Sequence, residues 1–271
     1  MTKLAFINND FVNEDKAALH LKDLSIQRGY GVFDFFRMVE NEPLFLDDHL
    51  DRFHFSAEGL HLPIALSRHE IKRIVEEIIT KNNLPGTGIR LTLTGGYSAD
   101  GFTLARPNFM VSQHLFTPPA KEQIEKGIKI LSYPHQRQLS SFKTIDYLMA
   151  VWLQPLLKEK GYDDILYHQQ GTITECPRSN FFMVTRGDVL VTPATNVLAG
   201  ITRKKILDLT NKGLIVEERP IHLNEIKEAK AAFITSTTKQ ILPVAQIDDV
   251  VLPQRKMLLE LLQLFQRRYS C

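Results

Sequence analysis

The stretch TECPRSNFF, residues 174–182, places a single carboxylate directly before an apolar run. The run continues to residue 185 and reads as a buried strand, and residues 164–168 read as its partner across the turn at residues 169–171. Burying an unpaired carboxylate is costly, so a glutamate beside such a strand rarely arises for structural reasons. Glu175 is therefore interpreted as a functional group.

Strands and helices alternate on both sides of this stretch. Apolar spacing predicts a helix over residues 67–83, which opens with a capping box made by Ser67 and Glu70. The alternating run 88–94 predicts a strand, and the second half contains a further predicted helix over about 144–160. The mixture of elements in both halves predicts a mixed α/β (α+β) fold.

The Pro-rich run TPPA at residues 117–120 is the clearest break in the chain. It predicts a smaller N-terminal α/β domain over residues 1–117, a linker over 118–123 and a larger C-terminal α/β domain over 124–271.

The composition excludes several classes of protein. A formal net charge of +2 over 271 residues is too small to indicate a nucleic-acid partner. Two cysteines, Cys176 and Cys271, are too few for a disulfide framework, and no CxxC pair predicts a metal site. No apolar run predicts a signal peptide or a membrane span. We expect a cytoplasmic protein with 44% hydrophobic residues and an ordinary core.

Six segments in a fixed order carry a family resemblance. They are DLSIQRGYGVFD (23–34), HLDRF (49–53), SSFKTIDYL (140–148), TECPRSNFF (174–182), LAGITR (198–203) and FITSTTK (233–239). Together they resemble the class IV (fold type IV) pyridoxal-phosphate-dependent aminotransferases, and most of all the D-amino-acid transaminases. The first segment departs from the family pattern, because Arg28 replaces an aromatic residue, Tyr30 an aspartate and Asp34 a glutamate.

The resemblance implies a two-domain architecture with pyridoxal 5'-phosphate at the domain interface. Lys143, in the C-terminal domain, would be the Schiff-base lysine and proton carrier, and Glu175 would pair with the ring nitrogen. Arg52 would bind the phosphate, because a guanidinium suits phosphate bidentately. The remaining expected cofactor contacts are Tyr147 at the phenolic oxygen, Leu198 on the ring face, and Ile201, Thr202, Thr237 and Thr238 at the phosphate.

The substrate is less well defined by these segments. Amino and 2-oxo acids need a cationic anchor, and Arg28, Arg90 and Arg178 are the candidates. The arginine–histidine carboxylate trap of some D-amino-acid transaminases is missing, because the corresponding run, residues 94–97, reads TGGY. We hypothesise that the three arginines replace it. The alternative is that some of them form salt bridges, at a subunit interface or with Asp34 or Asp146.

The resulting prediction is a transaminase that moves an amino group between a D-amino acid and a 2-oxo acid such as 2-oxoglutarate. Branched-chain L-amino-acid transamination and aminodeoxychorismate lyase activity are the alternatives on the same scaffold. A non-enzymatic relative is disfavoured, because a binding module has no use for Lys143, Glu175 and Arg52 together. The resemblance also implies a homodimer, in which Arg28 of the neighbouring subunit completes the site.

Overall fold

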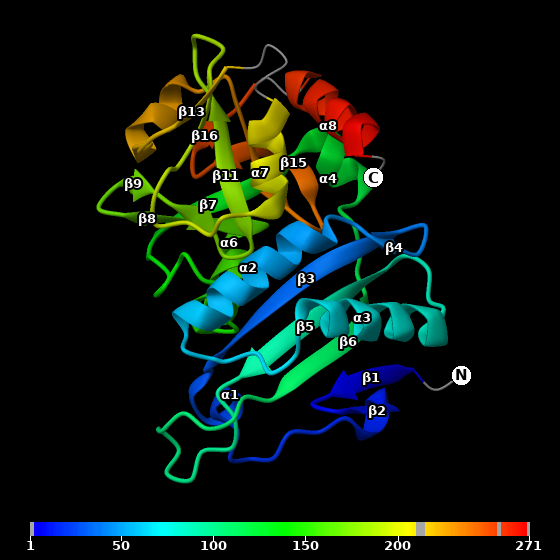
Figure 1. Cartoon of the computed structure of the whole chain (residues 1–271). Coiled ribbons are helices and arrows are strands. Elements are labelled where there is room, and N and C mark those ends of the chain that lie inside the picture. Colours follow the sequence, from blue (N-terminus) through cyan, green and yellow to red (C-terminus); the bar gives the residue numbers. More distant parts are fainter. Residues whose placement is uncertain (1–2, 210–214, 254–255, 270–271) are drawn as a thin grey trace. The chain divides into compact units, whose positions relative to one another are not determined.

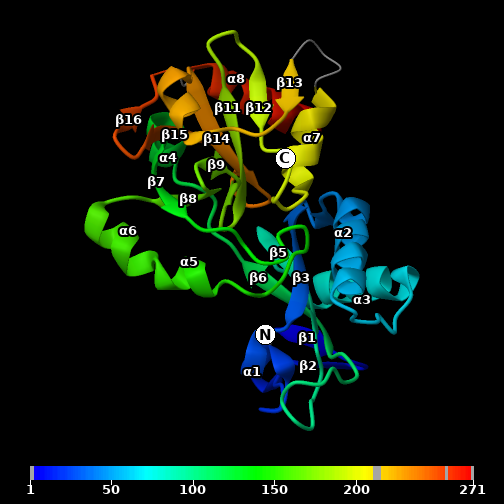
Figure 2. The same cartoon turned by 90° about the vertical axis from the view of Figure 1, so that its left-hand side faces the viewer.

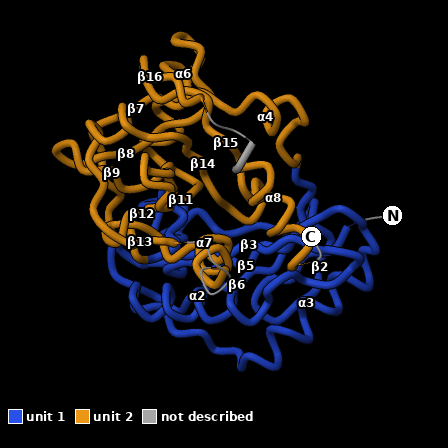
Figure 3. Tube along the Cα trace, turned by 90° about the horizontal axis from the view of Figure 1, so that it is seen from above, with its two compact units in different colours: residues 1–116, 142–146 blue, residues 117–141, 147–271 orange. Residues whose placement is uncertain are grey.

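The computed structural model describes residues 3–209, 215–253 and 256–269. It divides the chain into two compact units, coloured separately in Figure 3. Unit 1 comprises Met1–Phe116 and Phe142–Asp146, and unit 2 comprises Thr117–Ser141 and Tyr147–Cys271.

Unit 1 is built on one antiparallel sheet with the strand order β2-β1-β6-β5-β3-β4. Figure 2 shows helices α2 and α3 together on one side of β3, β5 and β6. The elements of unit 1 are β1 (Leu4–Ile7), β2 (Asp10–Asn13), the 3-10 helix η1 (Glu14–Lys16), α1 (Leu24–Arg28), β3 (Gly31–Val39), β4 (Glu42–Pro43), α2 (Leu46–Gly59), α3 (Arg68–Asn82), β5 (Thr87–Thr94) and β6 (Phe109–Leu115).

The core of unit 1 lies between the sheet and these two helices. Strand side chains alternate between the faces of a sheet. The β5 residues Ile89, Leu91 and Leu93 are fully or almost fully buried and join one cluster with the apolar stripes of α2 and α3. The helix predicted over residues 67–83 is confirmed as α3, and its capping box forms as predicted. The alternate β3 and β5 residues lie on the opposite face of the sheet.

Unit 2 contains a mixed ten-stranded sheet in the described residues, with the main order β13-β12-β11-β14-β15-β7-β8-β9 (Figure 1). Its elements are α4 (Lys121–Lys126), β7 (Ile128–Pro134), α5 (Leu148–Trp152), α6 (Gln154–Lys160), β8 (Asp164–Gln169), β9 (Thr172–Ile173), β10 (Glu175–Cys176), β11 (Ser179–Val184), β12 (Leu190–Thr192), α7 (Ile201–Leu207), β13 (Val216–Glu218), η3 (Leu223–Glu228), β14 (Ala231–Ser236), β15 (Gln240–Ile247), β16 (Val250–Val251) and α8 (Lys256–Tyr269).

Strand β11 is buried along its whole length because both faces of this sheet are covered. Phe181 and Met183 join one apolar cluster, while Phe182 and Val184 join another that includes α8 residues. A strand covered on both sides needs a continuous apolar run rather than alternation. This explains why residues 179–184 read as uninterrupted apolar sequence after Ser179 and Asn180.

The predicted pairing of strand 164–168 with strand 179–185 is wrong. Strand β11 pairs with β10, β12 and β14, whereas β8 pairs with β7 and β9. The turn at residues 169–171 joins β8 only to the two-residue strand β9. Closeness in sequence favours β8 as the partner of β11, but β14, which comes some fifty residues later, lies beside β11.

The predicted helix over residues 144–160 is also shorter than expected. It consists of α5 and α6, which meet at Leu153, and residues 144–147 are not helical. Thr144 forms a β-bridge with Val32, and the amide of Ile145 donates to the carbonyl of Gly31. These contacts explain why the structure groups Phe142–Asp146 with unit 1, whereas the sequence placed Lys143 in the C-terminal domain.

The boundary near residue 117 coincides with the end of the first stretch of unit 1 at Phe116. The predicted linker, residues 118–123, contains the start of α4. No helix in the described part of the chain is long and apolar enough to cross a membrane.

Candidate active site

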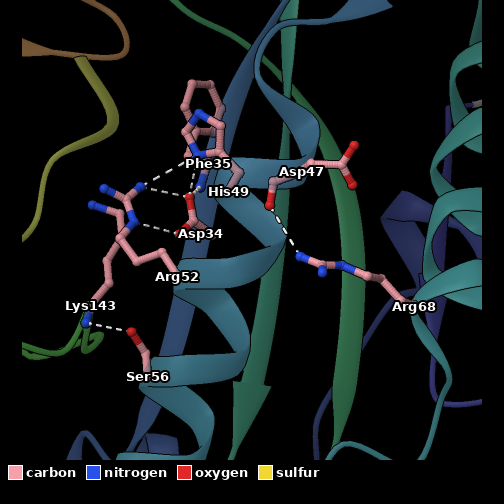
Figure 4. Close-up of polar contacts among 8 residues, drawn as sticks. All are labelled: Asp34, Phe35, Asp47, His49, Arg52, Ser56, Arg68 and Lys143. Atoms are coloured by element: carbon pink, nitrogen blue, oxygen red, sulfur yellow. Dashed lines mark hydrogen bonds and ion pairs between the residues drawn. The ribbon is translucent and has the colours of Figure 1, made fainter. Parts of the chain in front are cut away.

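Lys143 lies in an extended segment that is fixed on two sides within unit 1. Its carbonyl oxygen accepts a hydrogen bond of 3.0 Å from the amide of Phe33 on β3. Its amide donates to Oγ of Ser56, a fully buried residue of α2, at 3.0 Å (Figure 4). The Nζ atom lies 4.6 Å from the centroid of the Phe33 ring. The lysine is therefore attached to rigid elements through its backbone, while its side chain lies over an aromatic ring.

Arg52, the predicted phosphate ligand, forms a buried ion pair with Asp34. Its Nε donates to Oδ2 and its Nη2 to Oδ1, both at 2.8 Å (Figure 4). Asp34 is fully buried and also accepts hydrogen bonds from the amide of Phe35 at 2.8 Å and the ring of His49 at 2.7 Å. These contacts to Asp34 occupy two of the five donors of the guanidinium.

Burial and charge set the protonation of this group. Burial acts to raise the pKa of Asp34, but the charge of Arg52 and the hydrogen bonds from Arg52 and His49 lower it well below the usual range of an aspartate. Burial lowers the pKa of His49, and Asp34 only partly offsets this effect. Asp34 is therefore ionised and His49 neutral at pH 7. With Asp34 ionised, Nδ1 of His49 must carry the proton that it shares with Oδ1.

Two of the three candidate substrate arginines, Arg28 and Arg90, belong to unit 1 and have different surroundings there. Arg90, half-buried on β5, lies with its Cζ 3.9 Å from the centroid of the same Phe33 ring that faces Lys143. Its Nε also contacts Oγ1 of Thr92 at 3.3 Å. Arg28 ends the short helix α1, is exposed, and donates to the carbonyl of Gln27 at 2.9 Å. Arg90 and the Lys143 amine therefore contact the same aromatic ring, whereas Arg28 lies at the end of α1.

Of the salt bridges considered as alternatives for these arginines, the contacts above bear only on the one with Asp34. Asp34 is paired with Arg52 and His49. Arg178 lies exposed in the turn between β10 and β11 of unit 2, two residues after the end of β10.

In unit 2, Glu175 and Asn180 lie directly opposite one another on β10 and β11 and hold Leu198 between them. The amide of Leu198 donates to Oε2 of Glu175 at 2.9 Å, and its carbonyl accepts from Nδ2 of Asn180 at 2.8 Å. The signature quoted in the sequence thus positions the residue predicted to pack on the cofactor ring. Both polar side chains are buried.

Glu175 has a further partner that sequence reasoning missed. Nε of Arg137 donates to Oε1 of Glu175 at 2.7 Å, and its Nη2 donates to the carbonyl of Ser140 at 2.8 Å. The side chains of Arg137 and Glu175 are 10% and 5% exposed, so the pair is almost fully removed from water. Arg137 follows β7 in a loop without a recognisable motif, and nothing local marks it.

The predicted phosphate contacts of unit 2 lie at one end of the sheet. Thr237 and Thr238 occupy the turn between β14 and β15, and β14 pairs with β11 so that Thr235 lies opposite Asn180. Ile201 and Thr202 begin α7, whose N-cap residue Gly200 has no side chain that could cap the helix. A Cβ atom at Gly200 would lie 1.9 Å from Oδ1 of Asn180, so the backbone approaches closely here.

Tyr147 is half-buried and precedes the first residue of α5. The structure thus places Lys143, Arg52 and Arg90 in unit 1, and Tyr147, Glu175, Leu198, Ile201, Thr202, Thr237 and Thr238 in unit 2. Asp34 and His49 lay in quoted segments without an assigned role. Ser56, Arg137 and the positioning role of Asn180 had no signal in the sequence.

Each unit by itself provides groups of the kind that amino transfer needs. Unit 1 contains an amine beside an aromatic ring and a buried guanidinium fixed by a carboxylate. Unit 2 contains a second buried carboxylate oriented by two fixed donors. Buried carboxylates held in this way are common in active sites, although structural ion pairs also occur.

Comparisons with known proteins agree with this chemistry. Residues 31–247 match the family model for class IV amino-transferases. A D-alanine aminotransferase of Listeria monocytogenes is 26% identical over 253 residues, covering 90% of this chain and 87% of the relative. A D-alanine aminotransferase of Bacillus licheniformis is 28% identical over 251 residues, covering 89% and 87%.

A solved structure shares the fold. The branched-chain aminotransferase of the archaeon Thermoproteus uzoniensis, solved with norvaline, superimposes with a TM-score of 0.88 at 24% identity, covering 98% of this chain and 94% of that one. The mixed α/β fold is thus the fold type IV of the aminotransferases. The match of the family model over most of the chain establishes that the protein belongs to the class IV aminotransferases, which are pyridoxal-phosphate-dependent enzymes.

Proposed function

We propose that the protein is a transaminase that moves an amino group between a D-amino acid and a 2-oxo acid such as 2-oxoglutarate, with pyridoxal 5'-phosphate as cofactor. The observation that carries the proposal is the shared position of Lys143 and Arg90 against the Phe33 ring. An amine that handles the amino group and a guanidinium that binds a carboxylate are the two groups that an amino acid requires.

The residues present fit the cofactor. Arg52 would bind the phosphate through its guanidinium, which gives two of its five donors to Asp34. The start of α7, which has no side-chain cap, and the turn with Thr237 and Thr238 would supply further donors to it. Glu175 would bind the ring nitrogen, Leu198 would pack on the ring, and Tyr147 would contact the phenolic oxygen. When bound, the cofactor supplies an aldehyde and an electron-accepting ring.

Each residue then has a definite task. The Lys143 amine would hold the cofactor and, once the substrate displaces it, would move a proton to and from the substrate Cα. The Phe33 ring and the backbone bonds of Lys143 restrict where its Nζ can go. Glu175 would keep a proton at the ring nitrogen, and the Arg52–Asp34 pair would anchor the phosphate.

The substrate assignment rests on charge. A guanidinium that contacts the same ring as the lysine amine favours substrates that carry a carboxylate, such as D-alanine, D-aspartate or D-glutamate with 2-oxoglutarate. The names of the two D-alanine aminotransferases support this assignment. Branched-chain L-amino-acid transamination is the second candidate, favoured by the name of the Thermoproteus uzoniensis enzyme. Aminodeoxychorismate lyase activity would use the same Lys143 and Glu175 without an amino acceptor.

A homodimer is part of the proposal. The region around α1 and the loop after β5 exposes several large apolar side chains: Leu21, Ile26, Tyr97, Phe102 and Leu104. Phe102 is 82% exposed. Arg28 lies within this region, because its Nη2 is close to Gly101. Covering such a patch with a second copy would bury it and would direct Arg28 toward the neighbouring subunit.

The test is a single-turnover absorbance measurement on protein loaded with pyridoxal phosphate. D-Glutamate, D-alanine, L-glutamate and L-leucine are added separately, and conversion of the cofactor to its aminated form is followed. Conversion by D-glutamate or D-alanine, with L-leucine inert, supports the proposal. Conversion by L-leucine assigns the protein to the branched-chain group. A cofactor band that no amino acid changes indicates the lyase, and a Lys143→Ala protein that keeps the wild-type band would refute the role of Lys143.

A further inference from the structure

Arg137 forms a direct ion pair with Glu175. Arg137 lies outside the six sequence segments that carry the family resemblance. The guanidinium donates to Oε1 from Nε at 2.7 Å, while the amide of Leu198 donates to Oε2 at 2.9 Å. Each carboxylate oxygen therefore has a fixed donor, and a carboxylate can accept more than two hydrogen bonds. These two donors together fix the orientation of the Glu175 carboxylate.

The same guanidinium also holds the chain that leads to the lysine. Nη2 of Arg137 donates to the carbonyl of Ser140 at 2.8 Å, and Ser140 precedes Lys143 by three residues. The planar guanidinium fixes the directions of its donors, so both bonds form from one rigid group. A lysine at this position would keep the charge but could not reproduce both directions.

Several other charged and titratable groups lie near Glu175 or its neighbours in the described part of unit 2. Asp164 and Lys239 are paired with each other at 2.8 Å. Burial raises the pKa of Tyr167 and of Cys176, so both stay neutral at physiological pH. Arg137, by contrast, brings its positive charge into direct contact with the Glu175 carboxylate.

We infer that Arg137 is a positioning residue that keeps Glu175 ionised and aimed, and thereby sets how strongly the site holds a proton at the cofactor ring nitrogen. This inference rests on the proposed function, since it assigns Arg137 a task toward the same cofactor. A buried carboxylate without a cation takes up a proton more readily, because water no longer stabilises its charge. A protonated Glu175 could not stabilise a positive ring nitrogen.

The test compares wild type, Arg137→Met, Arg137→Lys, Glu175→Gln and the double variant Arg137→Met/Glu175→Gln. The rate of the amino acid half-reaction is measured against pH. In Arg137→Met we expect a rate about 10- to 100-fold lower near pH 7, the size common when a group that orients a functional residue is removed. The low-pH limb of the profile should move upward by roughly 1–3 pH units, the effect of losing an adjacent opposite charge. Arg137→Lys should restore most of that limb.

A second readout needs no cofactor. Removing one partner of a buried ion pair leaves the charge of the other partner without that counter-charge, so Arg137→Met should lower the Tm of the cofactor-free protein by roughly 6–20 °C at pH 8. Without the adjacent charge of Arg137, the buried Glu175 should bind its proton more tightly in the folded state than in the unfolded state. Its destabilising effect is therefore absent at low pH and grows as the pH rises, so the loss of Tm should be smaller at pH 5.5 than at pH 8.

Glu175→Gln provides the decisive comparison, because it removes the charge that Arg137 serves. In that background, Arg137→Met should change the rate by less than about 2-fold if Arg137 acts through Glu175. Arg219→Met is the matched control, since Arg219 also binds a glutamate, Glu225, at 2.8 Å and a backbone carbonyl in unit 2. It should leave the pH profile unchanged.

The possible failures are distinguishable. Equal rate losses from Arg137→Met in both backgrounds, or an unshifted pH limb, would overturn the inference. A wild-type protein that shows no cofactor band and no half-reaction would refute the proposed function, while non-additive Tm changes would still establish the coupling between Arg137 and Glu175.

Discussion

The substitution Asp34→Asn tests how much the buried ion pair between Asp34 and Arg52, the predicted phosphate ligand, contributes to the stability of the protein. Asparagine has nearly the same shape as aspartate, so it removes the charge without leaving a cavity. Asp34 is fully buried and Arg52 is 8% exposed, and two hydrogen bonds of 2.8 Å join them. The change would leave a buried guanidinium without its counter-charge, a loss that typically costs about 3–5 kcal/mol.

For a chain of this size, each kcal/mol corresponds to about 2–4 °C in Tm. We therefore expect Asp34→Asn to lower the Tm of the cofactor-free protein by roughly 6–20 °C at pH 7. The folded-state pKa of Asp34 lies below its unfolded value, so its stabilising contribution is fully present above the unfolded pKa. The difference between variant and wild type should therefore be constant from about pH 5.5 to 7.5 and shrink below about pH 4.

The assay is thermal unfolding followed by circular dichroism at several pH values, with and without pyridoxal phosphate. Asp51→Asn is the matched control, since Asp51 also pairs with an arginine, Arg68, but is 65% exposed. Exposed pairs contribute little, so this control should behave like wild type. A Tm change in Asp34→Asn no larger than in Asp51→Asn would refute the reasoning. The opposite pH trend, with a larger loss at low pH, would also refute it.

Three further predictions concern the site. Gly200→Ala should weaken cofactor binding by at least about tenfold in a fluorescence titration, because the added Cβ would lie 1.9 Å from Oδ1 of Asn180. Gly187→Ala is the control and should bind the cofactor normally, because its Cβ would meet nothing closer than 3.9 Å. Arg90→Gln should raise the KM for 2-oxoglutarate by roughly 10- to 100-fold in steady-state kinetics, while the cofactor absorbance stays unchanged. A KM within twofold of the wild-type value would assign Arg90 a structural role. Asn180→Asp places a second carboxylate directly opposite Glu175 and should lower the Tm more at pH 8 than at pH 5, which pH-dependent unfolding would show; a pH-independent change would contradict it.

The sequence was sufficient for features that local spacing encodes. The capping box of Ser67 and Glu70 and the apolar spacing that follows it define α3 without reference to the rest of the chain. The break near residue 117 also follows from composition, since proline cannot continue a helix or a central strand. The class of enzyme followed from motifs, each of which is a short local pattern.

The sequence was insufficient where the partner lies far away in the chain. Strand pairing is such a case, because β11 pairs with β14 rather than with the nearer β8. The missing helical turn after Lys143 is another. Helical spacing over residues 144–147 was outweighed by the tertiary bonds of Thr144 and Ile145 to β3. Backbone groups take whichever hydrogen bonds the whole fold offers, and intrinsic propensity is a weak preference by comparison.

The arginines that pair with buried carboxylates are a further case in which the partner lies far away in the chain, and this case concerns the functional site. The cost of burying a carboxylate identified Glu175 as functional, but the same cost requires that a buried carboxylate obtain a counter-charge from somewhere. In unit 1, Asp34 pairs with Arg52, which lies 18 residues away in the sequence. In unit 2, Glu175 pairs with Arg137, which lies 38 residues away. Arg137 had received no role at all, because its motif-free loop gave no local reason to choose it.

The consequence is that buried acids should be counted before arginines are assigned to a substrate. Asp34 and Glu175 each use one arginine, and the arginine that each uses is then oriented and desolvated by that bond. Arg90 and the Lys143 amine both contact the Phe33 ring, and this shared contact is the reason for proposing Arg90 as the group that binds a substrate carboxylate. The basic character of the site is therefore smaller than a count of nearby arginines indicates. Substrate selectivity should depend mainly on Arg90, and cofactor electrostatics on Arg52 and Arg137.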